Sequence, residues 1–108
     1  MIYETLEINR TGSVAFVNLN RPEARNAMNR QMVRDLLDYF LAIRDDRSVR
    51  VVVLGANGPV FCAGGDLKEM QAGFTEDEAT QVAQVQVFDE MLTAVSTAPQ
   101  VTIAKIHG

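Results

Sequence analysis

The chain has 108 residues, of which 47% are hydrophobic and 22% are charged, and its net charge is −4. This length supports one small domain or part of one, and the composition is that of a soluble globular protein and not of a disordered one. The acidic balance argues against broad binding of nucleic-acid phosphates, which requires many clustered Lys and Arg side chains.

The single cysteine, Cys62, cannot form an internal disulfide, so a reducing compartment fits the composition. No apolar run reaches the roughly 18 residues that span a bilayer, and the N-terminus lacks a basic stretch followed by an apolar one. We therefore expect a cytoplasmic protein that binds neither nucleic acid nor membrane.

The first part of the chain predicts a β-hairpin followed by an amphipathic helix. Residues 2–8 alternate between apolar and polar, and residues 14–19 continue the strand pattern after a glycine-containing turn at 9–13. Asn29 is the expected N-cap of the helix, whose apolar residues recur every three or four positions until about Asp45.

A buried strand at residues 51–55 leads into a glycine-rich loop. Gly64 and Gly65 lack side chains, so a ligand could approach the backbone closely there. Asp66 and Glu69 have the spacing of a capping box, which predicts that a helix begins directly after Asp66 and leaves free amides near the loop. Many tight turns need glycine for geometry alone, so a purely structural turn remains the other interpretation.

A longer helix and a last strand are expected after this loop. Thr75 and Glu78 form a second possible capping box, and Pro99 should end the helix that follows. Residues 101–106 have the pattern of a strand. The resulting order of strands and helices predicts an α/β layer with crossover connections.

Few side chains of the chain indicate catalytic or metal-binding chemistry. His107 is the only histidine, and the carboxylates lack metal-ligand spacing, so we predict no metal site. Cys62 has no identifiable partner base and fits a small packing residue. The acidic residues 76–78 fit a helix start, and the methionines, Met70 among them, fit core filling.

Two stretches, in this order and spacing, resemble the N-terminal part of the enoyl-CoA hydratase/isomerase (crotonase) family. They are RPEARNAM at residues 21–28, ahead of the amphipathic helix, and FCAGGDLKEM at residues 61–70, after the buried strand. The resemblance runs through all 108 residues. It implies an α/β fold of the crotonase type, a spiral of ββα turns, of which residues 1–108 form only the N-terminal turns.

The resemblance also implies a site. In this family a coenzyme A thioester lies bent across the loop as substrate, with no covalently bound cofactor, and the first of two backbone amides that bind the thioester oxygen matches Gly65. The positions that match the coenzyme-binding segment are Ala24, Arg25, Ala63, Gly64, Gly65, Asp66, Leu67 and Lys68. The implied reaction is hydration of a 2-enoyl-CoA by a lyase, and the implied assembly is a homotrimer or a dimer of trimers.

The chain departs from the family pattern at its last residues. His107 and Gly108 stand where family members continue into the second oxyanion amide and the catalytic glutamates, so we expect a chain that is truncated before that segment and inactive alone. A non-catalytic acyl-CoA-binding or assembly module is the alternative. A third possibility is an unrelated α/β nucleotide binder, although neither a GxGxxG nor a GxxxxGK[ST] pattern occurs.

Overall fold

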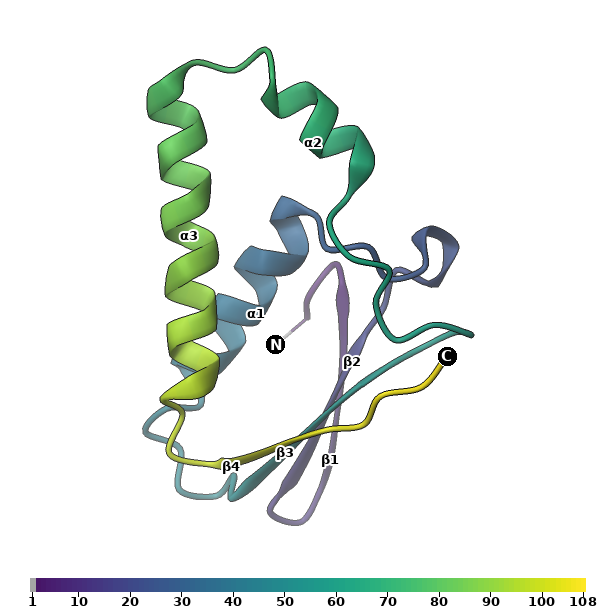
Figure 1. The fold of residues 1–108 in the computed structure, drawn as a ribbon. Coiled ribbons are helices and arrows are strands. Elements are labelled where there is room, and N and C mark those ends of the chain that lie inside the picture. Colours follow the sequence, from purple (N-terminus) through teal and green to yellow (C-terminus); the bar gives the residue numbers. More distant parts are fainter. Residues whose placement is uncertain (1) are drawn as a thin grey trace.

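A computed structural model describes residues 2–108. Over this range the elements follow one another from a hairpin into alternating helices and strands (Figure 1). They are β1 (Leu6–Thr11), β2 (Val14–Leu19), the 3₁₀ turn η1 (Pro22–Ala24), α1 (Arg30–Ala42), β3 (Val51–Ala56), α2 (Leu67–Gly73), α3 (Glu78–Ser96) and β4 (Val101–Ala104). The predicted α/β organisation is confirmed.

The strands form one sheet in the order β1-β2-β3-β4. β1 and β2 are antiparallel, as a hairpin must be, whereas β2, β3 and β4 are parallel to one another. Parallel neighbours need a crossover, and α1 provides the first crossover while α2 and α3 provide the second. As a result, the end of β3 and the beginning of α1 lie at the same edge of the sheet.

The core lies between one face of the sheet and α1. Alternate strand residues such as Val17 and Val52 point to this face and are fully buried. They meet the apolar stripe of α1, in which Met32 and Phe40 are also buried. By contrast, α3 buries only Met91 and Ala94 of its residues, so most of its apolar side chains remain uncovered in residues 2–108.

The first strand of the hairpin begins and ends later than expected. β1 begins at Leu6, because the Thr5 N–H and hydroxyl both donate to the buried Asp35 carboxylate, at 2.9 and 2.7 Å, instead of to a strand. At its other end β1 continues to Thr11, so the turn is shorter than predicted and centres on Gly12, whose φ of +59° favours glycine.

The helix caps were predicted in part. Asn29 caps α1 as expected, with its side chain accepting from Met32 N–H at 2.9 Å, but α1 ends at Ala42 and not near Asp45. The second capping box is wrong, because Asp77 caps α3 by accepting from Thr80 N–H at 2.8 Å. Asp is a better N-cap than Thr, and the predicted Thr75–Glu78 spacing did not take this preference into account.

Candidate functional site: a glycine loop beside an apolar cleft

A buried asparagine holds the glycine-rich loop (residues 57–66) against the segment before α1. Asn26 is fully buried, and its side-chain amide donates to the carbonyls of Asn57 at 2.8 Å and Val60 at 2.9 Å. Its side-chain oxygen accepts from Arg21 N–H at 2.7 Å. Because all its polar atoms are engaged, Asn26 fixes the distance between two segments that are far apart in sequence.

The tip of the loop pairs with this segment as a short parallel bridge. Met28 N–H donates to the Gly64 carbonyl at 2.7 Å, and Asp66 N–H donates to the Met28 carbonyl at 3.2 Å. In parallel pairing, the residue between these two contacts turns its own N–H away from the partner. Among the hydrogen bonds of residues 2–108, none uses the Gly65 N–H. This donor is therefore free to bind another group.

The two glycines at the tip differ in why a side chain would be unfavourable. Gly64 has a φ of +108°, which L side chains rarely adopt, although a Cβ there would meet no atom within 4 Å. At Gly65 the backbone is not strained, but a Cβ would lie 3.2 Å from Met70 Sδ. The loop thus presents bare backbone on its outer side.

This backbone lines an open cleft of about 700 Å³ between the loop, α2 and α3. Most of its wall is apolar, with Met70 and Phe74 contributed from the α2 side and Val85 and Phe88 from α3. The full lining is Met28, Arg30, Val33, Cys62, Gly64, Gly65, Asp66, Glu69, Met70, Gly73, Phe74, Gln81, Gln84, Val85 and Phe88. A free N–H beside an apolar surface suits a ligand with one polar atom and an apolar body.

The charged groups in this wall already have protein partners. Asp66 accepts from Glu69 N–H at 3.0 Å and pairs with Arg21 at 3.2 Å, and these two contacts hold its pKa below the usual value. Glu69 does not complete the predicted capping box; its carboxylate accepts instead from Arg30 N–H at 2.7 Å. The Arg30 guanidinium in turn makes a two-pronged ion pair with Glu76, which lowers the pKa of that carboxyl.

The predicted site residues fall into two groups. Gly64, Gly65 and Asp66 line the cleft. The others surround it: Arg25 is tied to the loop because its carbonyl accepts from Ala63 N–H at 3.0 Å, and Ala24 ends the 3₁₀ turn η1 just before it. Leu67 and Lys68 form the exposed first turn of α2 and lie outside the cleft lining.

The apolar residues of the cleft were not predicted as site residues. Met70 had been interpreted as a core residue, yet it is 54% exposed and lines the cleft. Val85 and Phe88 have the spacing of a packed helix face, which a cleft wall and a core share. The role of Asn26 was also not predicted, because the two carbonyls that its side-chain amide binds lie more than 30 residues away.

His107 and Cys62 take structural positions. The His107 ring Nε2 lies 2.8 Å from the Gly58 carbonyl, and the His107 carbonyl accepts from Phe61 N–H at 3.1 Å. Cys62 is half-buried, packs against the core and lies at the cleft wall. In residues 2–108, no group of three or more His, Cys, Asp or Glu side chains is arranged to hold a metal ion. Nor does any helix in that range have the length and apolarity to cross a membrane.

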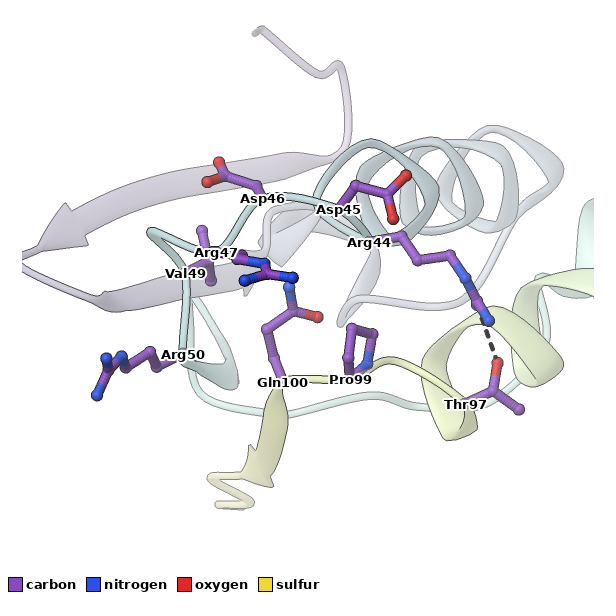
Figure 2. Close-up of a pocket in the computed structure, with 9 residues that line it drawn as sticks. All are labelled: Arg44, Asp45, Asp46, Arg47, Val49, Arg50, Thr97, Pro99 and Gln100. Carbon is purple, nitrogen blue, oxygen red and sulfur yellow. Dashed lines mark hydrogen bonds between the residues drawn. The ribbon is translucent and has the colours of Figure 1, made fainter.

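A second cavity lies at the other end of the sheet (Figure 2). It measures about 840 Å³ and is formed where α1 ends and where β3 and β4 begin. Its lining is mostly polar and charged: Arg44, Asp45, Asp46, Arg47, Val49, Arg50, Thr97, Pro99 and Gln100. One hydrogen bond crosses it, from Arg44 Nη1 to Thr97 Oγ1 at 3.2 Å.

Comparisons with known proteins agree with the fold and the loop. The family model described as enoyl-CoA hydratase/isomerase matches residues 9–108. The chain is 34% identical to the mitochondrial Delta(3,5)-Delta(2,4)-dienoyl-CoA isomerase of Mus musculus over 98% of its own length and 35% of that protein. It is 39% identical to the mitochondrial enoyl-CoA hydratase domain-containing protein 2 of Bos taurus, over 88% of the chain and 31% of the relative.

Solved structures give the same result. Pseudomonas aeruginosa AtuE superposes with a TM-score of 0.93 at 38% identity, over 97% of this chain and 41% of that one. The chain thus spans about a third of the length of the curated relatives it matches, at 35% and 31% for the two named above. Its elements correspond to the N-terminal part of the crotonase fold. The chain belongs to the enoyl-CoA hydratase/isomerase family.

Proposed function

We propose that this chain binds an acyl-CoA thioester and that the Gly65 N–H donates a hydrogen bond to the thioester oxygen during hydration of a 2-enoyl-CoA. The observation that carries this proposal is the Gly65 amide, which has no acceptor among residues 2–108 and lines an apolar cleft. Membership of the family supplies the substrate class, a coenzyme A thioester that needs no further cofactor.

The chemistry requires such a donor. When water attacks the β-carbon of an unsaturated thioester, the electrons of the double bond move toward the carbonyl, and negative charge develops on its oxygen before the α-carbon takes up a proton. A fixed N–H stabilises this enolate without reorganisation, and one donor is worth about 3 to 4 kcal/mol of barrier. Glycine suits position 65 because the thioester must contact the backbone directly, without a side chain in between.

The coenzyme is proposed to lie along the loop outside the cleft. Ala24, Arg25 and Ala63 form one joined strip there, held by the hydrogen bond from Ala63 to Arg25. Arg25 and Lys68 are exposed cations without an ion pair among the described residues, which suits the phosphates of coenzyme A. Leu67, which is 73% exposed, would offer an apolar surface next to Lys68.

Residues 1–108 contain one proposed donor and no identified general acid or base. We therefore propose that they are the N-terminal part of a longer polypeptide, whose later residues supply the second oxyanion amide and the proton-transfer groups. The proposed assembly of that polypeptide is a trimer or a dimer of trimers in the cytoplasm. Light scattering and cell fractionation test these two statements directly.

Double-bond migration is a second candidate, because the mouse relative is named as a dienoyl-CoA isomerase. It needs the same enolate stabilisation at Gly65, since a proton leaves and rejoins the carbon skeleton instead of water being added. A non-catalytic acyl-CoA-binding module would need the cleft but no turnover.

The test uses the full-length polypeptide with crotonyl-CoA in water enriched in heavy oxygen. Hydration removes the absorbance of the conjugated thioester and places the label in the product. Migration in a dienoyl-CoA changes the absorbance without labelling, and the module binds both thioesters without converting either. Absence of binding to any acyl-CoA would contradict the proposal.

A further inference from the structure

The α2 helix, which forms one wall of the cleft, is weakly held by packing. None of its residues is buried, and Met70 on its cleft side is 54% exposed, while Phe74 directly after it is 81% exposed. A helix of seven residues is also too short to be stable alone. The position of this wall must therefore depend on polar contacts.

Besides the backbone bridge at Met28, three side-chain contacts join the α2 region to the segment before and at the start of α1. The Asp66–Arg21 ion pair fixes the beginning of α2, and the Glu69 carboxylate accepts from Arg30 N–H in its middle. Beyond the end of α2, both terminal nitrogens of the Arg30 guanidinium donate to the Glu76 carboxylate. This last pair is partly shielded, with side-chain exposures of 34% for Arg30 and 22% for Glu76. It is the contact that ties the far end of the wall to α1.

The cleft runs along this wall from the free Gly65 amide to Phe74 and Gln81. The seven residues of α2 correspond to about 10 Å at 1.5 Å per residue. The carboxylates and the guanidinium at its border are paired within the protein, so the remaining surface between Gly65 and Phe74 is apolar. An uncharged acyl chain that starts at Gly65 would fit this space.

We infer that the Arg30–Glu76 ion pair is a positioning device that holds the α2 wall against the acyl chain, and so makes binding of long apolar acyl groups depend on this pair. The inference rests on the proposed function, since it needs the thioester to sit at Gly65. Each methylene buried on the wall should strengthen binding about fourfold. Short acyl groups, which end near Gly65, do not reach Met70 and Phe74 and should not be affected by the pair.

The experiment measures the dissociation constants of acetyl-CoA and octanoyl-CoA by calorimetry on the full-length polypeptide. In Glu76→Gln, octanoyl-CoA should bind about 15-fold more weakly, the loss of roughly two buried methylenes, while acetyl-CoA binding stays unchanged. Glu78→Gln is the matched control, because it removes the same charge from an exposed neighbour that has no ion pair among the described residues. The double exchange Arg30→Glu with Glu76→Arg should restore the preference for octanoyl-CoA.

Salt provides a second measurement that needs no substitution. Added salt screens the coenzyme phosphates equally for both thioesters, so only the ratio of their affinities reports on the wall. That ratio should fall with salt in the wild-type protein and stay flat in Glu76→Gln. Equal weakening of both thioesters, or no change in either, would overturn the inference and leave the proposed function standing. If neither thioester binds the wild-type protein, the proposed function fails as well.

Discussion

Two cavities among residues 2–108 lie at opposite ends of the same sheet and differ in chemistry more than in size. The larger one, about 840 Å³, is bordered by exposed charged residues such as Arg47 and Asp46. The smaller one, about 700 Å³, has an apolar wall and a free backbone donor at Gly65. Volume alone would favour the charged cavity over the proposed site.

Topology explains the difference. In open α/β sheets, ligands bind outside the carboxyl ends of the parallel strands, where the chain leaves each strand and can form a loop. The glycine-rich loop follows the end of β3, whereas the charged cavity surrounds the beginnings of β3 and β4. At the first end the backbone is fixed by the buried Asn26; at the second, charged side chains such as Arg44 and Arg47 border the cavity (Figure 2).

The largest effect should come from removing the donor itself. Gly65→Pro deletes the one N–H within residues 2–108 that is proposed to bind the thioester oxygen, and kcat of the full-length enzyme should fall about 10²- to 10³-fold. Gly65→Ala keeps the N–H but adds a Cβ beside the substrate, 3.2 Å from the flexible Met70 Sδ, so it should lower kcat less than Gly65→Pro does. If Gly65→Pro keeps its fold by circular dichroism and its kcat is unchanged, the proposed role of the Gly65 N–H, and with it the catalytic role of the apolar cleft, is contradicted.

A smaller loss should follow from removing the buried amide behind the loop. Asn26→Asp keeps a residue that tolerates the left-handed backbone of this position (φ 55°) but leaves the carbonyls of Asn57 and Val60 without their donor, which should lower the free energy of unfolding by about 3 kcal/mol. Urea denaturation measures this change. Asn57→Ala, which removes only an exposed contact to Asn20 at 3.1 Å, should change the free energy of unfolding by no more than about 0.5 kcal/mol. Equal effects of the two substitutions would contradict the assigned role of Asn26.

Acid should weaken the α2 end of the cleft. The pKa values of Asp66 and Glu76 are lowered in the folded chain, the first mainly by the Glu69 N–H and the second mainly by Arg30. A carboxyl whose folded pKa is depressed stabilises the fold above its unfolded pKa, about 4, and this contribution is lost as pH falls through the folded value.

The double variant Asp66→Asn with Glu76→Gln should therefore lose less stability between neutral pH and about pH 3 than the wild-type chain does. Urea midpoints taken across this range measure the difference. Asp46→Asn serves as the comparison at the other cavity, since the Asp46 pKa is also lowered, there by Ser48. A pH dependence that disappears only in Asp46→Asn would place the acid-sensitive contacts at the charged end instead.

The smallest effect is expected in the charged cavity. Arg47 is exposed and has no ion pair among residues 2–108, so Arg47→Ala should change the free energy of unfolding by no more than about 0.5 kcal/mol. Acyl-CoA affinity, measured by calorimetry, should be unchanged. A marked loss of affinity would mean that the larger cavity takes part in binding.

The sequence was sufficient for the parts that depend on local rules. The strand that ends before the loop, the Asn29 cap and the start of α2 after Asp66 follow from periodicity and capping chemistry, and the structure confirms them. The loop itself was visible because consecutive glycines between a buried strand and a helix are uncommon without a backbone requirement. Gly64, at a φ of +108°, has that requirement.

The parts that were missed depend on tertiary contacts. Nothing in the neighbourhood of Asn26 distinguishes it from an exposed turn asparagine, because the two carbonyls that its side-chain amide binds follow some 30 residues later. Glu76 looked like one of several helix-start carboxylates, and only the approach of Arg30 makes it an ion pair. Phe88 has the same periodicity as core residues, and the arrangement of α3 and α2 places it in a cleft wall.

The most direct test of the central claim follows backbone amide signals by NMR while acyl-CoA is added to the labelled full-length protein. The Gly65 amide proton should move downfield as its hydrogen bond to the thioester oxygen forms, and the signals of Arg47 and Gln100 should stay in place. A Gly65 signal that does not move at saturating ligand, with shifts confined to the charged cavity, would contradict the account.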